Sequence, residues 1–156
     1  MDSNYGKSGA ITISGGNVFA YSATGSEEGI DCDNNSYIVV TGGIAVTAGG
    51  RMGSSGTSSI GSSTQGYYLG ASPSSYSSTK YYTLCNTSGE AICTYKFACN
   101  VSNSLGLLTA PNLGKGSITI KTGTDKPTAC DVSVNDVFFI NPTVTTTATA
   151  ATVTAK

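Results

Sequence analysis

Four of the nine Asp and Glu residues crowd into one short stretch of this chain: Glu27, Glu28, Asp31 and Asp33. If Ile30 and Cys32 point inward on an extended strand, alternation places Glu27, Asp31 and Asp33 together on the outward face. Carboxylate oxygens are the ligands that Ca²⁺ prefers, and a bound cation relieves the repulsion between like charges. The stretch therefore predicts a calcium site, with a solvated acidic corner held by Asx-type turns as the open alternative.

Two adjacent pairs of tyrosines, Tyr67-Tyr68 and Tyr81-Tyr82, are the second chemical feature. Rings on a flat β face can stack on sugar rings, and the phenolic hydroxyl adds a polar partner. Neighbouring residues on a strand face opposite sides, so at most one ring of each pair is a platform. All four are therefore candidate carbohydrate-binding residues, and cross-strand packing is the alternative for each of them.

The rest of the composition excludes several classes of function. The chain of 156 residues has no His, only 11% charged residues and a net charge of −1. Without His there is no Ser-His-Asp or Cys-His catalytic arrangement of the usual form, and no imidazole zinc site. Lys and Arg are scattered singly, so no basic patch forms that could neutralise the phosphates of nucleic acid.

The cysteines are Cys32, Cys85, Cys93, Cys99 and Cys130. Their spacings lack the close C-x₂₋₄-C pairs of zinc ribbons. We interpret them as small buried hydrophobes on strands. One or two disulfides among the last four remain the alternative.

The elements that carry these residues are predicted to be strands throughout. Short alternating strings such as 10–13, 37–40 and 117–120 recur between turn signals, and windows with helical periodicity are nearly absent. The sequence therefore predicts an all-β fold.

Two of these strings form a repeat. Residues 11–16 (ITISGG) align with residues 38–43 (IVVTGG) at an offset of 27 residues. A period of this size is typical of a solenoid, whose coils return one strand spacing higher. We expect Ile11 to stack beside Ile38, Ile13 to stack beside Val40, and the Gly pairs to mark corners. An ordinary β-sandwich is the alternative.

The chain length suits a single domain over residues 1–156. Within it we expect β-helix coils in 1–50, a Gly/Ser-rich loop region in 51–79 and a C-terminal β-strand region in 80–156. The last region should open with a hairpin over 80–97. Further strands should lie near 105–109, 116–121, 131–140 and 143–154, and the uncharged last one would expose an edge that invites self-association. No apolar run approaches the length of a membrane helix, so we expect no membrane span.

Several of these segments resemble one bacterial family. Residues 11–20, 27–31 and 38–43, together with 107–113 and 116–123, are similar to the calcium-dependent carbohydrate-binding β-helix family, whose studied members bind cellulose and acidic pectic polysaccharides. The resemblance implies a right-handed single-stranded parallel β-helix with a C-terminal antiparallel β region. It also implies calcium at Glu27, Glu28, Asp31 and Asp33. Family members show more coils, so this chain corresponds to a C-terminal portion or a short relative.

Three classes of function follow. The first is an extracellular carbohydrate-binding module that contacts plant-type or acidic polysaccharide through calcium. The second is a structural cell-surface or filament-forming protein that assembles by strand-edge or end-to-end contacts. The third is a polysaccharide lyase, but a lyase needs a base beside calcium-bound uronate, and Arg51 lies in a Gly/Ser loop. We therefore expect no enzymatic activity.

Overall fold

The computed structural model describes residues 9–23, 29–30, 32, 36–49, 59–102, 105–144 and 147–156. Regular structure in these residues consists of strands and includes no helix, which confirms the all-β prediction. The strands are β1 (Ala10–Tyr21), β2 (Tyr37–Ala48), β3 (Ser59–Ser63), β4 (Tyr67–Gly70), β5 (Ser75–Tyr76), β6 (Tyr81–Cys85), β7 (Ala91–Tyr95), β8 (Val101–Ser102), β9 (Gly106–Thr109), β10 (Gly116–Gly123), β11 (Val132–Val134), β12 (Phe138–Ile140) and β13 (Ala148–Ala155).

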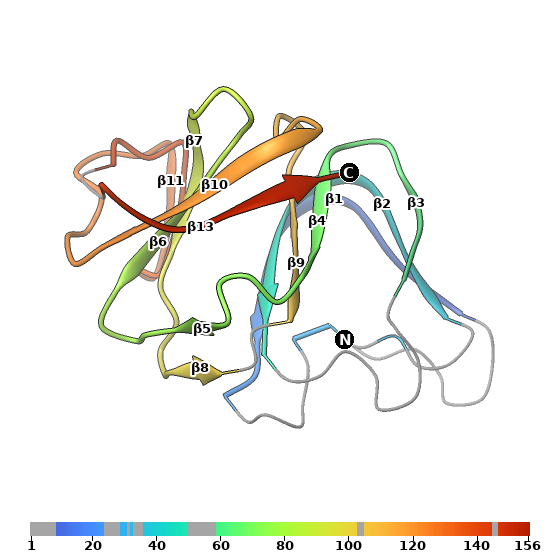
Figure 1. The fold of residues 1–156 in the computed structure, drawn as a ribbon, viewed down its shortest axis with the longest axis horizontal. Coiled ribbons are helices and arrows are strands. Elements are labelled where there is room, and N and C mark those ends of the chain that lie inside the picture. Colours follow the sequence, from blue (N-terminus) through green and yellow to red (C-terminus); the bar gives the residue numbers. More distant parts are fainter. Residues whose placement is uncertain are drawn as a thin grey trace.

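These strands form two main sheets and one small one. The five-stranded sheet has the order β1-β2-β9-β4, with β3 also paired to β2. The six-stranded sheet has the order β11-β12-β7-β6-β10-β13, and β5 pairs with β8. Figure 1 shows the six-stranded sheet on one side of the molecule and the bent strands β1, β2 and β3 on the other, with β9 and β4 between them.

The repeat predicted from sequence is a parallel strand pair in the structure. β1 and β2 run parallel, with Ile11 beside Ile38 and Ile13 beside Val40, which confirms the expected stacking. β3 continues the parallel stack and places Ile60 beside Ile38. The aliphatic ladder therefore extends over three strands.

The stack does not close into a helix. The second half of β2 pairs antiparallel with β9, and β9 pairs antiparallel with β4. The described residues thus show no right-handed β-helix, and their open sheets fit the β-sandwich alternative. The antiparallel pairing expected for the C-terminal region is present throughout the six-stranded sheet.

The Gly pair of β2 lies at a corner where two backbones approach closely. A Cβ added at Gly42 would lie 2.6 Å from the carbonyl oxygen of Ser14 on β1, and one at Gly43 would lie 2.7 Å from the carbonyl carbon of Gly15. Gly43 also has a φ of 87°, in the left-handed region that favours glycine. Both residues must therefore be glycine for β2 to stack on β1.

Beyond this corner the strands lie between two hydrophobic cores. The coil core consists of Ile11, Ile13, Ile30, Cys32, Ile38, Val40, Ala45 and Leu107. The main core lies against the six-stranded sheet and includes Val46, Leu84, Tyr95, Leu108 and Ile118. Neighbours on one strand divide between the cores: Ala45 faces the coil core, and Val46 faces the main core. The second half of β2 is therefore buried on both faces.

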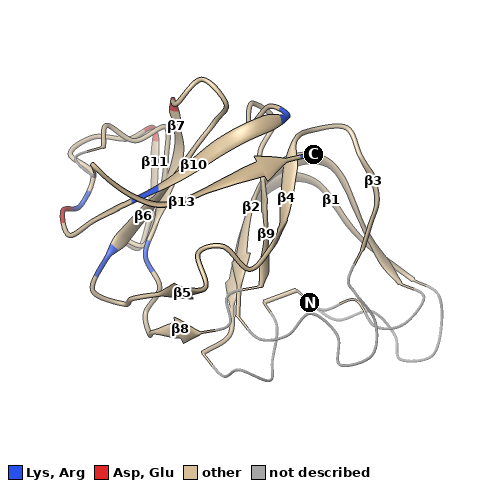
Figure 2. Ribbon diagram, in the orientation of Figure 1, with Lys and Arg blue, Asp and Glu red and all other residues tan. Residues whose placement is uncertain are grey.

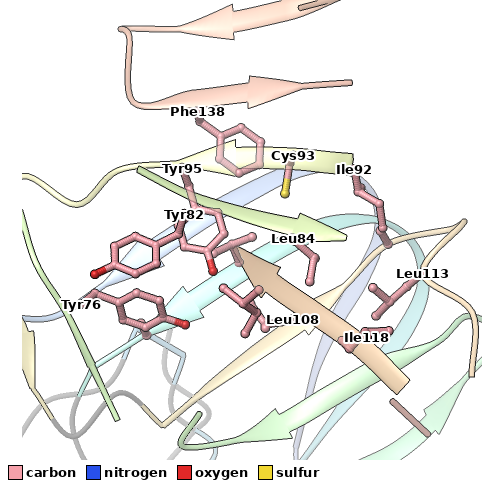
Figure 3. Packing of buried hydrophobic residues seen from close by; sticks show 14 of the residues in the cluster. Tyr76, Tyr82, Leu84, Ile92, Cys93, Tyr95, Leu108, Leu113, Ile118 and Phe138 are labelled. Atoms are coloured by element: carbon pink, nitrogen blue, oxygen red, sulfur yellow. The ribbon is translucent and has the colours of Figure 1, made fainter. Parts of the chain in front are cut away.

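Aromatic rings fill the main core (Figure 3). The Tyr82 ring stacks on Tyr95 with 6.0 Å between centroids, and Tyr76 meets Tyr82 edge-on at 4.7 Å. Phe19 of β1 stacks on Phe97 at 5.3 Å, so the coil strand is tied to the six-stranded sheet. Burial raises the pKa of Tyr76 and of Tyr95 well above the ordinary value, so both hydroxyls stay protonated in the folded protein.

Two segments differ from the sequence prediction. The region 51–79, expected to be a loop, contains β3, β4 and β5 within its described part. The single strand expected over 131–140 is a hairpin of β11 and β12. Its turn has Asn135 and Asp136 at φ values of 48° and 56°, and the Val137 amide donates to the Val134 carbonyl at 3.0 Å. Two consecutive positive φ values are the mark of a tight hairpin turn, and Asn and Asp tolerate them.

Replacing two core tyrosines should separate packing from hydrogen bonding. The Tyr95 hydroxyl lies near Tyr76 but is buried without a hydrogen bond of ordinary geometry, whereas the Tyr82 hydroxyl accepts from the Ser77 amide at 2.7 Å. We expect Tyr95→Phe to leave the free energy of unfolding unchanged or raised, because a buried unpaired hydroxyl costs about 1–3 kcal/mol. Tyr82→Phe should lower it by about 1 kcal/mol. Urea denaturation of both variants measures this, and a larger loss for Tyr95→Phe would contradict it.

Candidate functional site

One hollow among the described residues lies beside the first tyrosine pair. It has a volume of about 330 Å³, and we call it the tyrosine cavity. Its lining residues come from β3, β4 and the end of β13: Ser59, Ile60, Tyr67, Tyr68, Leu69, Thr154 and Lys156. The cavity therefore lies where the five-stranded sheet meets the six-stranded sheet.

The two tyrosines of β4 face different cores, as their adjacency predicts. Tyr67 packs against the coil core and Tyr68 packs against the main core. Both side chains stay partly exposed, and a Cβ added at Gly70 would overlap the Tyr68 ring. Each ring thus has one side held by protein and another that reaches the cavity.

Backbone hydrogen bonds fix the far wall of the cavity. The Lys156 amide donates to the Tyr67 carbonyl at 2.8 Å, and the Tyr67 amide donates to the Lys156 carbonyl at 3.2 Å. This reciprocal pair joins the residue after β13 to the first residue of β4. Because both bonds are between backbones, the separation of Tyr67 from Lys156 is set by the sheets and not by side-chain rotamers.

A buried polar network supports β4 from behind. The Gln65 side chain, only 7% exposed, donates from Nε2 to the Gly43 carbonyl and to the Thr109 hydroxyl, both at 2.8 Å. Thr109 Oγ1 in turn donates to the Gly66 carbonyl at 2.7 Å. Since every bond in this chain is buried or half-buried, it holds the entry to β4 against both β2 and β9.

The chemistry of the tyrosine cavity is aromatic, hydroxylic and cationic. Tyr67 and Tyr68 supply rings and phenols, Ser59 and Thr154 supply alcohols, and Lys156 supplies an exposed ammonium. None of its lining residues is acidic. A cavity of this kind suits a ligand with a ring to stack on, hydroxyls to exchange hydrogen bonds and a negative group beside the lysine.

The second tyrosine pair lies away from this cavity. Tyr82 is 4% exposed and belongs to the main core. Tyr81 is 9% exposed; Phe139 meets it edge-on at 6.1 Å, and the Lys96 ammonium lies 5.0 Å from its ring centroid. Both rings are therefore packed against other side chains, as in the packing alternative for these tyrosines, and neither offers a free face on which a sugar could stack.

The acidic stretch has a different outcome. Glu27, Glu28, Asp31 and Asp33 lie outside the described residues. Their neighbours Ile30 and Cys32 are described, are 2% and 1% exposed, and belong to the coil core. The inward orientation of Ile30 and Cys32 that the calcium prediction assumes is thus present. The described residues themselves contain no cluster of His, Cys, Asp or Glu that could hold a metal ion.

Three of the five cysteines are buried. Cys32, Cys85 and Cys93 are buried, while Cys99 and Cys130 are partly exposed. Burial raises the pKa of the Cys93 thiol far above its ordinary value and also raises that of Cys85, where the nearby Lys121 partly opposes the effect. The prediction of small buried hydrophobes is confirmed for these strand cysteines of β6 and β7.

Several lining residues of the cavity carried no signal in the sequence. Lys156 and Thr154 are more than eighty positions from Tyr67, and Ser59 follows a Gly/Ser-rich stretch without periodicity. Only the pairing of β13 with β10 and the bonds from Lys156 to Tyr67 bring them together. Of the residues that line the cavity, the sequence singled out only Tyr67 and Tyr68.

Comparisons with known proteins do not assign a family. No protein-family model, curated protein or solved structure matches this chain. Among the described residues there is no helix of the length and apolarity needed to cross a membrane.

Thiol reactivity should follow burial. With a thiol reagent at pH 8, Cys99 and Cys130 should react quickly in the native protein, while Cys85 and Cys93 should react only on unfolding, because burial hides both sulfurs and a raised pKa leaves little thiolate. Mass spectrometry of peptides after a short pulse of iodoacetamide measures the order. Denatured protein is the control, and fast labelling of Cys93 in native protein would contradict the prediction.

Proposed function

We propose that this chain is an extracellular carbohydrate-binding module that contacts plant-type or acidic polysaccharide without cleaving it. The observation that carries the proposal is the tyrosine cavity, which combines two half-buried phenol rings with hydroxyls and one ammonium. Sugar rings present flat C–H faces and many hydroxyls, so aromatic faces and hydroxyl partners recognise them together.

An acidic sugar is the ligand class that the charge distribution favours. Lys156 lies beside the cavity, and its ammonium can pair with the carboxylate of a uronate by a charge-assisted hydrogen bond. The described acidic residues Glu90, Asp125, Asp131 and Asp136 belong to other parts of the chain and do not line the cavity (Figure 2). Among the described residues, no acidic side chain therefore lines the cavity beside this lysine.

Calcium is the second element of the proposal. Glu27, Glu28, Asp31 and Asp33 supply oxygen ligands of the kind that calcium takes, and a bound ion would also attract uronate carboxylates. The burial of Ile30 and Cys32 supports the inward orientation of these two residues that the calcium prediction assumes. The resemblance to the calcium-dependent β-helix family supports the same ion.

Removing one ring of the cavity should weaken glycan binding. We expect Tyr67→Ala to raise the dissociation constant for polygalacturonate by about tenfold, because an aromatic contact of this kind contributes roughly 1 kcal/mol beyond its buried area. Tyr37→Ala is the matched control, since Tyr37 is 41% exposed and does not line the cavity. Isothermal titration calorimetry measures both affinities.

The same titrations distinguish the class of sugar. Lys156→Gln should weaken binding to polygalacturonate while leaving binding to cello-oligosaccharides unchanged. Equal losses for Tyr67→Ala and Tyr37→Ala, or no heat with any pectic or cellulosic ligand, would overturn the proposal. Polygalacturonate incubated with the protein should release no unsaturated product.

Calcium removal tests the acidic stretch separately. A chelator should weaken binding to polygalacturonate, and Asp31→Asn should lower calcium affinity, because it removes one of few negative charges around the ion. Asp125→Asn is the control, since Asp125 is an exposed carboxylate of the loop after β10. Calcium titration followed by calorimetry should separate the two variants, and identical calcium binding would remove calcium from the proposal.

A further inference from the structure

The outer edge of β1 has no paired strand within the described part of the chain. β1 is the terminal strand of the five-stranded sheet; one of its edges pairs with β2, and no described residue pairs with the other. None of its twelve residues is charged. Natural edge strands are usually guarded by Lys, Pro or short length, so a long neutral edge is suited to pairing with another strand. Among the described residues, Figure 2 shows Lys, Arg, Asp and Glu mainly on the six-stranded sheet and its loops.

The glycines of β1 and β2 differ in what surrounds them. On β2, a Cβ at Gly42 would meet the Ser14 carbonyl oxygen at 2.6 Å. On β1, a Cβ at the equivalent Gly15 would meet nothing within 4 Å, and the same holds for Gly16. Gly16 has a φ of 72°, which alone explains glycine there, but Gly15 lies outside the left-handed region. Nothing within the described chain requires glycine at position 15.

The repeat indicates what the space beside Gly15 can hold. At the equivalent corner of β2, the space that a side chain would fill is occupied by the backbone of the neighbouring strand. A strand laid along the free edge of β1 would bring a backbone to the same position beside Gly15. The space beside Gly15, which the described residues leave open, is therefore where an approaching main chain could pass, and a methyl group there would obstruct it.

The position of the Gly pair in β1 makes this edge self-complementary. Ala10–Ser14 precede the pair and Asn17–Tyr21 follow it, so the pair lies at the centre of the strand. A twofold axis through this centre sets β1 antiparallel to its own copy, with Ser14 opposite Asn17 and Ile13 opposite Val18. Directly opposed residues of an antiparallel pair share a face of the sheet. Ile13 and Val18 both face the coil core, so the apolar faces match.

We propose that β1 pairs antiparallel with β1 of a second copy of this chain, about a twofold axis at Gly15-Gly16, to form a closed dimer. Each strand bends at the pair, so the corners of the two copies coincide and the two coil cores become continuous. An isologous contact of this kind uses the same surface on both partners and cannot grow into a filament. The dimer rests on the fold alone and stands apart from the carbohydrate proposal.

The first test is the oligomeric state of the full chain with one methyl group added. By sedimentation velocity over a range of concentrations, the natural chain should be a dimer in equilibrium with monomer. Gly15→Ala should keep its thermal midpoint and raise the dimer dissociation constant by at least about tenfold, because the methyl lies where the partner backbone would pass. Gly42→Ala is the matched control in the other repeat and should lower the thermal midpoint, since its methyl meets Ser14.

The second test is the register. Ser14→Cys and Asn17→Cys, each an exposed position of β1, should form a disulfide-linked dimer under mild oxidation when the two variants are mixed. Opposed Cα atoms of an antiparallel pair lie about 4.5–5.5 Å apart, within the range of a disulfide. Each variant alone should cross-link no more than the natural chain, whose five thiols set the background.

Four results would overturn the proposal: a natural chain that stays monomeric at the highest concentration, growth into larger assemblies, a Gly15→Ala variant that dimerises as well as the natural chain, or equal cross-linking in the mixed and separate variants.

Discussion

The close approach of β2 to the backbone of β1 at Gly42-Gly43 is the contact on which the rest of the structure depends. Because neither glycine carries a Cβ, the two strands bend together and keep their hydrogen bonds on both sides of the corner. The halves before the corner enclose the coil core, and the halves after it lie between two cores. A side chain at Gly42 would separate the strands and expose both cores at once.

The position of the tyrosine cavity follows from this arrangement. The second half of β2 is buried on both faces, so the backbone groups along its outer edge must pair with another strand. β9 pairs with that edge, and β4 pairs with β9. β4 ends that sheet and meets the residue after β13 through the reciprocal bonds of Tyr67 and Lys156. The cavity is thus formed at a junction of two rigid sheets, and a ligand bound there would meet groups that are already in place.

The sequence predicted the features that depend on local periodicity. The repeat of 27 residues predicted the pairing of Ile11 with Ile38, and the hairpin expected over 80–97 is that of β6 and β7. The sequence did not predict β3 or β4, because the hydrogen bonds that support them run from the Gln65 side chain to Gly43 and Thr109. Such contacts join residues far apart in the chain and leave no periodic pattern. The switch from parallel to antiparallel pairing at β9 was hidden for the same reason.

The same distinction applies to the tyrosines. Both pairs have the same composition and spacing, yet Tyr82 is enclosed by the main core while Tyr67 lines a cavity. What separates them is the position of their strands. β6 lies inside the six-stranded sheet with neighbours on both sides, whereas β4 is the last strand of its sheet. Ring exposure is therefore decided by strand order, which the residue pattern does not contain.

Neutral hydrogen bonds take the place that ion pairs have in many proteins. Thr83 and Thr94 bond across β6 and β7 at 2.7 Å with both side chains fully buried, whereas the ion pair of Lys126 with Asp136 is exposed and contributes little. The fold thus holds its strands together with few charges. Lys156 is the one charged side chain among the described residues that line the tyrosine cavity. Because Lys156 is exposed, its attraction for a negative ligand would be weakened by dissolved salt.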